Sequence, residues 1–291
     1  MANETGTKTP VFGAVAAAFA TWRATLPRIW TTVVACGALS AGASFATVRF
    51  AGGNPLLFFV SQLLVLAVFT YAYTAQSSAA LDVPAEPRRR VFDAARVYAA
   101  LSVIAFFLFI VFVAAMFPGA IILAASVPVE DLQALNAASG DPEAAMQMFS
   151  QLFAAHWPQL LIIAALYSAI WMFLTSRFYL AAPATIVERR VLTFETWRWT
   201  KGEAWRITAA RLLLLGPAQI AISLLQALLL AAFGAGPFSI DAMQSLLQKA
   251  PALHLAVLAP LHIVMQLLYW GLEAALSATL YKGLKPANAA P

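Results

Sequence analysis

Hydrophobic and polar residues alternate on a long scale, which divides the chain into six apolar runs separated by short polar connections. Each run is long enough to cross a hydrocarbon core of about 30 Å as a helix rising about 1.5 Å per residue. Because lipid cannot satisfy exposed backbone groups, the runs are expected to be α-helices. The predicted fold class is all-α, a polytopic membrane helix bundle. It forms one domain over residues 1–291, with transmembrane helices at about 29–49, 56–76, 99–125, 158–182, 208–233 and 253–280.

Proline and small residues mark where the predicted spans bend or pack closely. The third and sixth runs are longer than a span requires, so we expect a tilt or a kink, at Pro118-Gly119 in the third and at Pro260 in the sixth. Small side chains let neighbouring helix backbones approach each other. On the first run these positions are Gly37, Ser40, Gly42 and Ser44.

Three amphipathic, basic segments precede the first, third and fifth runs, at about 11–28, 87–98 and 191–206. Each has a phenylalanine near its start, and each is predicted to form a cytoplasmic interfacial helix. This order suggests three copies of one unit, an interfacial helix followed by a transmembrane hairpin. Short alanine-rich sequences also align without a true repeat, so both interpretations stay open.

Two further amphipathic helices are predicted in the outer loops. Asp141-Pro142-Glu143 has the order of an N-cap, a first-turn proline and an early acid, and apolar residues follow at helical spacing. Ser239 caps the second, which carries Ile240 and Met243 on one face. We expect these helices to cover the bundle at the outer surface, either as structural cover or as lids.

The composition excludes an ordinary soluble protein. Of the 291 residues, 62% are hydrophobic and 11% are charged, whereas a soluble domain carries about 25% charged residues. Six spans with short connections leave no length for a separate catalytic domain. The apolar stretch at 11–20 is short and is followed by Arg23, so we do not expect a cleaved signal peptide.

The basic residues give the orientation. If the N-terminus is cytoplasmic, the inner segments hold 14 of the 18 Lys and Arg residues, and the outer loop at 126–157 holds none. The positive-inside rule therefore predicts a multi-pass protein of the bacterial inner membrane, with segment 1–28 and tail 283–291 both cytoplasmic. Orientation and anionic lipid explain the net charge of +5 better than nucleic acid does. Membrane lipids are the expected partners.

Three charged residues interrupt the apolar runs: Arg177, Arg211 and Glu273. A charge at the centre of a membrane helix costs about 2.5–3.5 kcal/mol on insertion scales, so these residues are a candidate intramembrane polar site. All three fall in the predicted cytoplasmic half. Arg177 is the expected partner of Glu273, because Arg211 can extend to the membrane surface. An ion pair that fixes helix packing, a site for an anionic lipid headgroup and a proton-coupled path all stay open.

No residue pattern predicts catalysis, a cofactor or a metal. His254 and His262 lie two turns apart on the sixth run, with Gln266 one turn further, but no cysteine or nearby carboxylate completes a ligand set. Helix packing or interfacial hydrogen bonding is the expected role of these side chains. The predicted protein is non-enzymatic.

One stretch carries a family-like pattern. It begins Arg177-Phe178-Tyr179-Leu180-Ala181-Ala182-Pro183 and resumes as Trp197-Arg198-Trp199-Thr200-Lys201-Gly202-Glu203-Ala204-Trp205. Residues 177–207 resemble the bacterial membrane domain fused to some glycerophosphodiester phosphodiesterases and its stand-alone relatives of uncharacterised function. Thr196 and Trp199 depart from the family pattern, which has serine and leucine there. The matching residues are Arg177, Pro183, Glu188, Thr200, Lys201, Gly202 and Trp205.

The resemblance implies a membrane module without the hydrolase, and the function expected from it is lipid binding or a membrane-stress role. The alternative is a small transporter or permease component with a polar site in the cytoplasmic half of the bundle. The same residues also have a local structural interpretation. Pro183 fits the membrane exit, and Thr200 with Glu203 forms a capping box that starts the fifth span, with Gly202 in its first turn.

Overall fold

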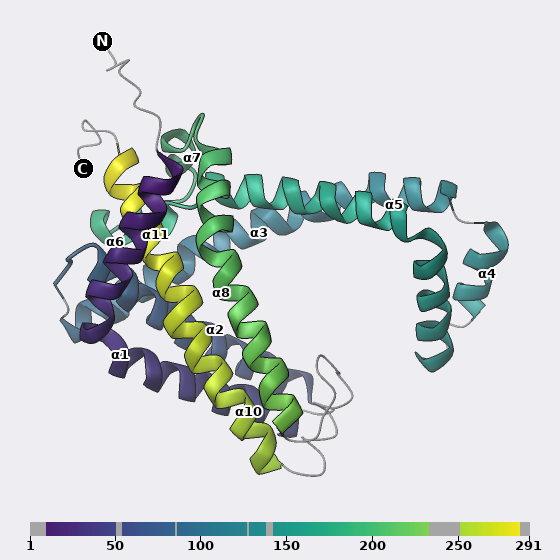
Figure 1. Ribbon diagram of the computed structural model, residues 1–291, viewed down its shortest axis with the longest axis horizontal. Helices are drawn as coiled ribbons and strands as arrows, with labels where there is room; N and C mark the ends of the chain where they lie inside the picture. The colour runs from purple at the N-terminus through teal and green to yellow at the C-terminus, as the bar shows by residue number, and fades with distance from the viewer. Residues whose placement is uncertain are drawn as a thin grey trace. The chain divides into compact units, whose positions relative to one another are not determined.

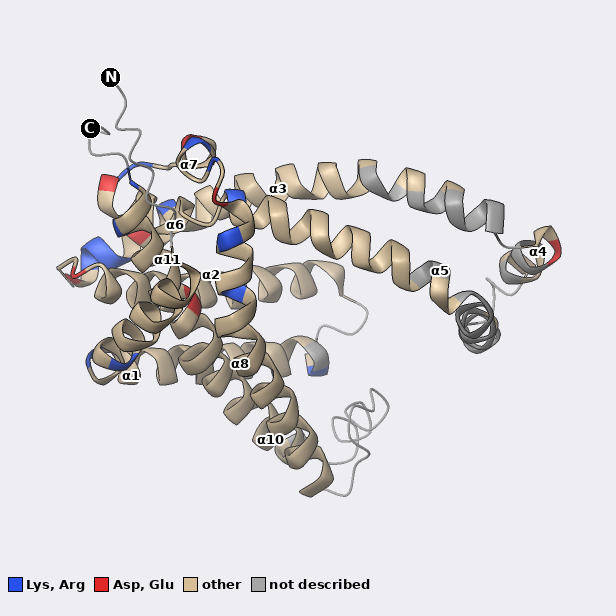
Figure 2. Ribbon diagram, turned by 45° about the horizontal axis from the view of Figure 1, so that its top comes forward, with Lys and Arg blue, Asp and Glu red and all other residues tan. Residues whose placement is uncertain are grey.

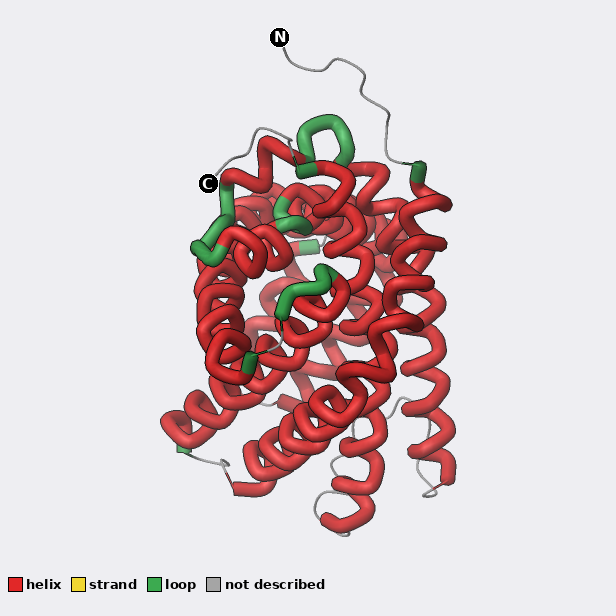
Figure 3. Tube along the Cα trace, turned by 90° about the vertical axis from the view of Figure 1, so that its left-hand side faces the viewer, coloured by secondary structure: helices red, strands yellow, loops and turns green. Residues whose placement is uncertain are grey.

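The described part of the chain is helical almost throughout. The structure is a computed structural model that describes residues 10–50, 54–84, 86–126, 128–137, 142–232 and 251–285. Within these ranges there is no β-strand, and loops join the ends of helices (Figure 3). The predicted all-α class is therefore confirmed. The helices are α1 (Val11–Phe50), α2 (Pro55–Ala80), α3 (Pro87–Ser126), α4 (Val129–Ala137), α5 (Pro142–Arg177), α6 (Ala181–Glu188), α7 (Glu195–Trp199), α8 (Ala204–Ala232), α10 (Pro251–Val264), a π-helical segment (Met265–Trp270) and α11 (Gly271–Leu284).

Six stretches of helix are long and apolar enough to cross a membrane. Large apolar side chains on them face outward, including Phe106 (67% exposed), Ile162 (68%) and Leu228 (68%). No Lys, Arg, Asp or Glu occurs between Arg96 and the end of α3, or between Glu143 and Arg177 in α5, and Figure 2 draws the described part of these stretches without charged residues. Apolar surface on this scale is stable against lipid and not against water, so the chain is a multi-pass membrane protein.

The chain forms two compact units, and a single domain over 1–291 was expected. One unit comprises Met1–Ser102 with Ser176–Pro291, and the other comprises Val103–Thr175. The division falls within α3 and next to the last residues of α5. All charged residues of the candidate polar site belong to the first unit, which the following sections describe.

The predicted interfacial segments before the first and third runs are not separate helices. Residues 11–28 and 29–49 form one 40-residue helix, α1, with Pro27 inside it, and Figure 1 shows a clear bend along α1. Segment 87–98 likewise runs directly into the third span in α3. A proline removes one backbone hydrogen bond and bends a helix, but good helix formers on both sides let the helix continue.

The third of these segments is built differently from the other two. Residues 191–194 form a turn, α7 spans five residues, and a second turn leads to α8. The proposed threefold repeat thus has two similar N-terminal helical extensions and one compact corner. Its third copy does not match the first two in local structure.

The ends of α2 are set by local side-chain and backbone signals. Asn54 accepts a hydrogen bond from the Leu57 amide at 3.1 Å, and Pro55 occupies the first turn. At the other end Leu81 is the C-cap, and Asp82 follows in the left-handed region with φ 56°. Asp tolerates this conformation better than most residues do, so the chain turns sharply into the connection that leads to α3.

The helix of the fourth span is interrupted earlier than predicted, although the apolar stretch continues to Glu188. Helix α5 stops at Arg177, five residues before the expected end at 182, and Pro183 lies in the first turn of α6 and not at a helix end. α5 also begins at Pro142, so the predicted outer helix after Asp141 is continuous with the span, and Pro158 lies inside it. The outer helix predicted from Ser239 lies outside the described residues.

The last span contains a change of helical form. Pro260 lies inside α10, where a kink was expected, but the irregularity occurs a turn later as the π-helical segment Met265–Trp270. The indole Nε1 of Trp22 donates a hydrogen bond to the Leu267 carbonyl at 2.8 Å. This hydrogen bond joins α1 directly to the π-helical segment.

The main core of the first unit joins the start of the chain to its end. Ala14 and Ala18 of α1 pack in one buried cluster with Leu276 and Leu280 of α11 and with residues of α6 and α8. Helix α1 begins and α11 ends side by side (Figure 1). This arrangement fits an even number of spans. That this side is the cytoplasmic one stays a prediction.

Candidate functional site

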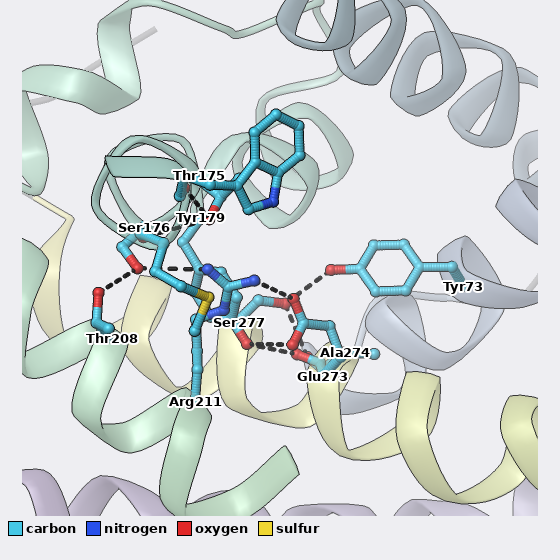
Figure 4. A network of polar contacts seen from close by, with 11 residues as sticks. Tyr73, Thr175, Ser176, Tyr179, Thr208, Arg211, Glu273, Ala274 and Ser277 are labelled. Atoms are coloured by element: carbon cyan, nitrogen blue, oxygen red, sulfur yellow. Dashed lines mark hydrogen bonds and ion pairs between the residues drawn. The ribbon is translucent and has the colours of Figure 1, made fainter. Parts of the chain in front are cut away.

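Glu273 and Arg211 form the centre of a buried polar network. Arg211 Nη2 lies 3.9 Å from Glu273 Oε1, and the side chains are 14% and 12% exposed. The Tyr179 hydroxyl donates to Glu273 Oε2 at 2.9 Å, and it also lies 3.3 Å from the Glu273 backbone carbonyl. One carboxylate therefore has two partners, one on α8 and one in the turn after α5 (Figure 4).

The Arg211 guanidinium has further partners on its other side. Its Nη1 donates to Ser176 Oγ at 3.3 Å, and its central carbon lies 4.8 Å from the centre of the Tyr179 ring. Ser176 Oγ lies 2.8 Å from Thr208 Oγ1, whose hydroxyl also reaches the Ala204 carbonyl. The charge is thus held by an ion pair, a hydroxyl and an aromatic face, which is how proteins stabilise a buried charge.

The network extends to α2 through a second tyrosine. The Tyr73 hydroxyl lies 3.2 Å from Ser277 Oγ, and Ser277 donates to the Ala274 carbonyl at 3.0 Å. Figure 4 shows Tyr73 approaching the Glu273 segment from the side opposite to Arg211. These contacts tie α2, α8, α11 and the turn after α5 together. A network bonded in this way supports fixed helix packing.

The structure brings together two of the three predicted charges, with the arginines exchanged. Arg211, expected to extend to the membrane surface, is the partner of Glu273. Arg177 is instead 7% exposed and its guanidinium lies over the Trp197 ring, with 4.6 Å to the ring centre. The reason is the early end of α5, because the turn at 178–180 directs Tyr179, and not Arg177, toward Glu273.

The predicted capping box is wrong. The Thr200 hydroxyl donates to the Arg177 backbone carbonyl at 2.9 Å and also contacts the Thr196 carbonyl, so it does not cap α8. Glu203 pairs with Arg206 at 3.0 Å. Gly202 lies in the turn before α8 with φ +84°, a conformation that favours glycine. Thr200 therefore joins α7 to the C-terminal end of α5.

Replacement of Thr200 tests this junction. Thr200→Val keeps the shape of the side chain and removes the donor to a buried carbonyl, so we expect the free energy of unfolding to fall by about 1–2 kcal/mol. Thr200→Ser, which keeps the hydroxyl, should cost clearly less. Thermal unfolding in detergent measures both. Equal destabilisation by valine and serine would show that the hydrogen bond is unimportant.

Glu188 of the family-like motif, the last residue of α6, bonds to residues at the end of α11. Its Oε1 accepts hydrogen bonds from the Tyr281 hydroxyl at 3.0 Å and from the Lys285 ammonium. The Glu188 carboxylate raises the pKa of Lys285 above its ordinary value. Of the remaining motif residues, Lys201 and Trp205 are exposed. The motif therefore describes a well-packed corner with an exposed basic and aromatic edge.

The histidines of the last span take no part in the polar network. His254 is buried and its ring packs against Phe45, with 5.8 Å between ring centres. Gln266 is fully buried within the π-helical segment. Among the described residues no three His, Cys, Asp or Glu side chains converge as metal ligands would.

Sequence reasoning missed the uncharged half of the network. Tyr73, Ser176, Tyr179, Thr208 and Ser277 lie in apolar runs, where hydroxyl-bearing residues are common and usually bond to their own helix. One signal was available for part of the set, since Tyr179 lies two residues after Arg177 in the family-like motif. No pattern in the sequence relates Tyr73 to Ser277.

Comparisons of the chain with protein-family models, with curated proteins and with solved structures give no match. The resemblance of residues 177–207 to the phosphodiesterase-associated membrane domain therefore stays a prediction.

Proposed function

We propose that the protein is a non-enzymatic bacterial inner-membrane protein that binds anionic lipids at the basic ends of its helices. The observation that carries this proposal is the burial of the Arg177 side chain without a carboxylate partner in the described part of the chain. That side chain is 7% exposed, and its only described contact is the stacking on Trp197. Among the described residues no carboxylate lies within ion-pair distance of this guanidinium.

A buried cation without a counter-ion is unfavourable in a membrane protein. An anionic headgroup at the membrane surface supplies the missing charge, and guanidinium groups bind phosphate oxygens well. Arg177 lies at the end of α5, next to the α7 corner that carries Arg198 and Lys201. The resemblance to the phosphodiesterase-associated membrane domain agrees with this proposal, because it would make the chain a membrane module without a hydrolase.

Lipid selectivity measured by native mass spectrometry tests the proposal. Protein purified from a mixture of phosphatidylethanolamine and phosphatidylglycerol is expected to retain the anionic lipid preferentially. Arg177→Gln should reduce this preference, and Arg177→Lys, which keeps the charge, should restore part of it. The Arg177 carbonyl that Thr200 uses is unchanged in both variants, so the α5–α7 junction is retained.

Arg190→Gln is the matched control, because Arg190 is exposed and loses the same charge. It should leave lipid selectivity close to that of the original protein. If the original protein shows no preference for anionic lipid, or if Arg177→Gln and Arg190→Gln behave alike, the proposal is wrong.

The transporter alternative drew on the possible repeat, on outer helices as lids and on a functional role for the intramembrane charges. Glu273 accepts a hydrogen bond from Tyr179 and is paired with Arg211, and Arg211 also donates to Ser176, which contacts Thr208. These contacts support a packing role for Glu273 more directly than a role in transport. Lipid binding is therefore the function that the geometry supports best.

A further inference from the structure

A second group of arginines surrounds a pocket in the first unit. The pocket has a volume of about 260 Å³ and lies where the middle of α1, the end of α2 and the start of α3 meet. Its lining includes Arg28 of α1, Ser78 of α2, Asp82 and Arg90 of α3. This pocket is distinct from the surroundings of Arg177, because none of its lining residues contacts Arg177.

Arg90 is the arginine of this pocket that forms no ion pair with any described residue. Its neighbour Arg89 lies 3.4 Å from Asp93, and Arg96 lies 2.9 Å from the same carboxylate. The Arg90 Nε is buried and has no hydrogen-bond partner among the described residues. Arg90 also lies in the first turn of α3, which contains no acidic residue, so the helix dipole adds positive potential at the same place.

The remaining charges leave the pocket positive. Asp82 contributes its one carboxylate, which lies 3.7 Å from Arg28 and 3.6 Å from Lys282. Lys282 also donates to the Ala80 carbonyl at 2.9 Å at the end of α2. Three cationic side chains thus stand against one carboxylate, and Asp82 is 72% exposed, so its charge is well screened by solvent.

The sequence around the pocket predicts that it lies at the depth of lipid headgroups. Arg28 is directly followed by Ile29, where the apolar run of α1 begins, and Ser78 lies two residues before the end of α2. Arg90 lies in the basic start of α3, before its apolar run. The pocket therefore opens where three helices pass from apolar to polar sequence. Basic pockets between membrane helices at this level are typical binding sites for phosphate-bearing headgroups.

We infer that this pocket binds the phosphate group of an anionic lipid, with Arg28 and Arg90 as the charged donors and Ser78 in the lining. Two guanidinium groups from different helices give phosphate oxygens paired, charge-assisted hydrogen bonds. The inference rests on the proposed function only in taking the ligand from the membrane. The same chemistry would accept a soluble phosphate compound, and the experiment separates the two sources.

Calorimetric titration of the whole protein in non-ionic detergent provides the test. Dioctanoyl phosphatidylglycerol is one ligand, and inorganic phosphate is the other. The double variant Arg28→Gln with Arg90→Gln is expected to bind the lipid about tenfold more weakly, which corresponds to the loss of charge-assisted contacts in a partly solvated site. Arg88→Gln is the matched control, since Arg88 is exposed two residues away and outside the lining; it should change binding less than about twofold.

Asp82→Asn gives a result of opposite sign, which loss of folding cannot imitate. It removes the carboxylate that competes for Arg28, and asparagine accepts the left-handed backbone at this position. We expect binding about threefold tighter than in the original protein. Glu86→Gln removes an exposed carboxylate outside the lining and should leave binding unchanged.

The outcomes distinguish this inference from the proposed function. If the double variant binds the lipid as well as Arg88→Gln does, the pocket assignment is wrong, and an effect of Arg177→Gln would leave the proposed function intact. If inorganic phosphate binds in the same Arg28- and Arg90-dependent way and the lipid does not, the pocket is a phosphate site for soluble compounds. If the original protein binds neither ligand, the inference that this pocket binds phosphate is wrong.

Discussion

Glu273→Ala is expected to lower the free energy of unfolding by about 3 kcal/mol, because it leaves the Arg211 guanidinium buried without its carboxylate. The same change removes the acceptor of the Tyr179 hydroxyl. Glu273→Gln keeps an acceptor for that hydroxyl and should cost less. Thermal or denaturant unfolding in a single detergent at fixed lipid content measures these differences.

A double-mutant cycle separates the ion pair from general packing. If Arg211 and Glu273 stabilise each other, the double variant Arg211→Met with Glu273→Met is less destabilised than the sum of the single variants, by about 1 kcal/mol or more. The control is Arg28→Gln, since the Arg28–Asp82 pair is exposed and should contribute less than about 1 kcal/mol. Strict additivity at Arg211 and Glu273 would mean that the 3.9 Å separation carries no useful attraction.

Gly37→Ala is the second substitution expected to have a large effect. A Cβ atom at residue 37 would lie 2.8 Å from Ile263 Cα and 3.1 Å from Ile263 N, both backbone atoms of α10. Backbone cannot move aside as a flexible side chain can, so α1 and α10 would have to separate. We expect the free energy of unfolding to fall by about 2–3 kcal/mol, as in other overpacked cores.

Gly42→Ala is the matched control on the same helix. A Cβ atom at residue 42 meets nothing within 4 Å, so this change should be neutral or stabilising by up to about 1 kcal/mol through helix propensity. Unfolding temperatures of the two variants, measured side by side, give the comparison. Equal destabilisation by both alanines would contradict the close approach of α1 and α10 at Gly37.

The two glycines also show what the sequence can and cannot predict. Both were predicted to permit close helix contact, because small residues serve that purpose in membranes. Only Gly37 faces a neighbouring backbone, since contact depends on which way each face of α1 points. Helix rotation is set by partners distant in the sequence. Composition and run length therefore predicted the spans well, but not their facing residues.

At the polar site too, the sequence predicts which residues are unusual but not which of them meet in the fold. The sequence singles out Arg177, Arg211 and Glu273 because charges in apolar runs are costly, and two of the three do meet. The choice of partner was wrong because it assumed that Arg211 extends to the membrane surface, whereas its guanidinium is held by Glu273 and Ser176. The helix ends at Arg177, and the following turn brings Tyr179 to Glu273.

The π-helical segment at Met265–Trp270 fixes the rotational phase of the last helix. A π turn takes up about one more residue than an α turn, and one residue corresponds to about 100° of helix rotation. The buried faces of α10 and α11 therefore point in different directions around the helix axis. Residues before and after the π-helical segment can then pack against different neighbouring helices. In this phase Gly271 lies against Trp22 and Gln76, where a Cβ atom would come within 2.8 Å of both side chains, and Glu273 meets Arg211 two residues later. A deletion of a single residue between 265 and 270 would restore ordinary winding and turn the carboxylate away from its arginine.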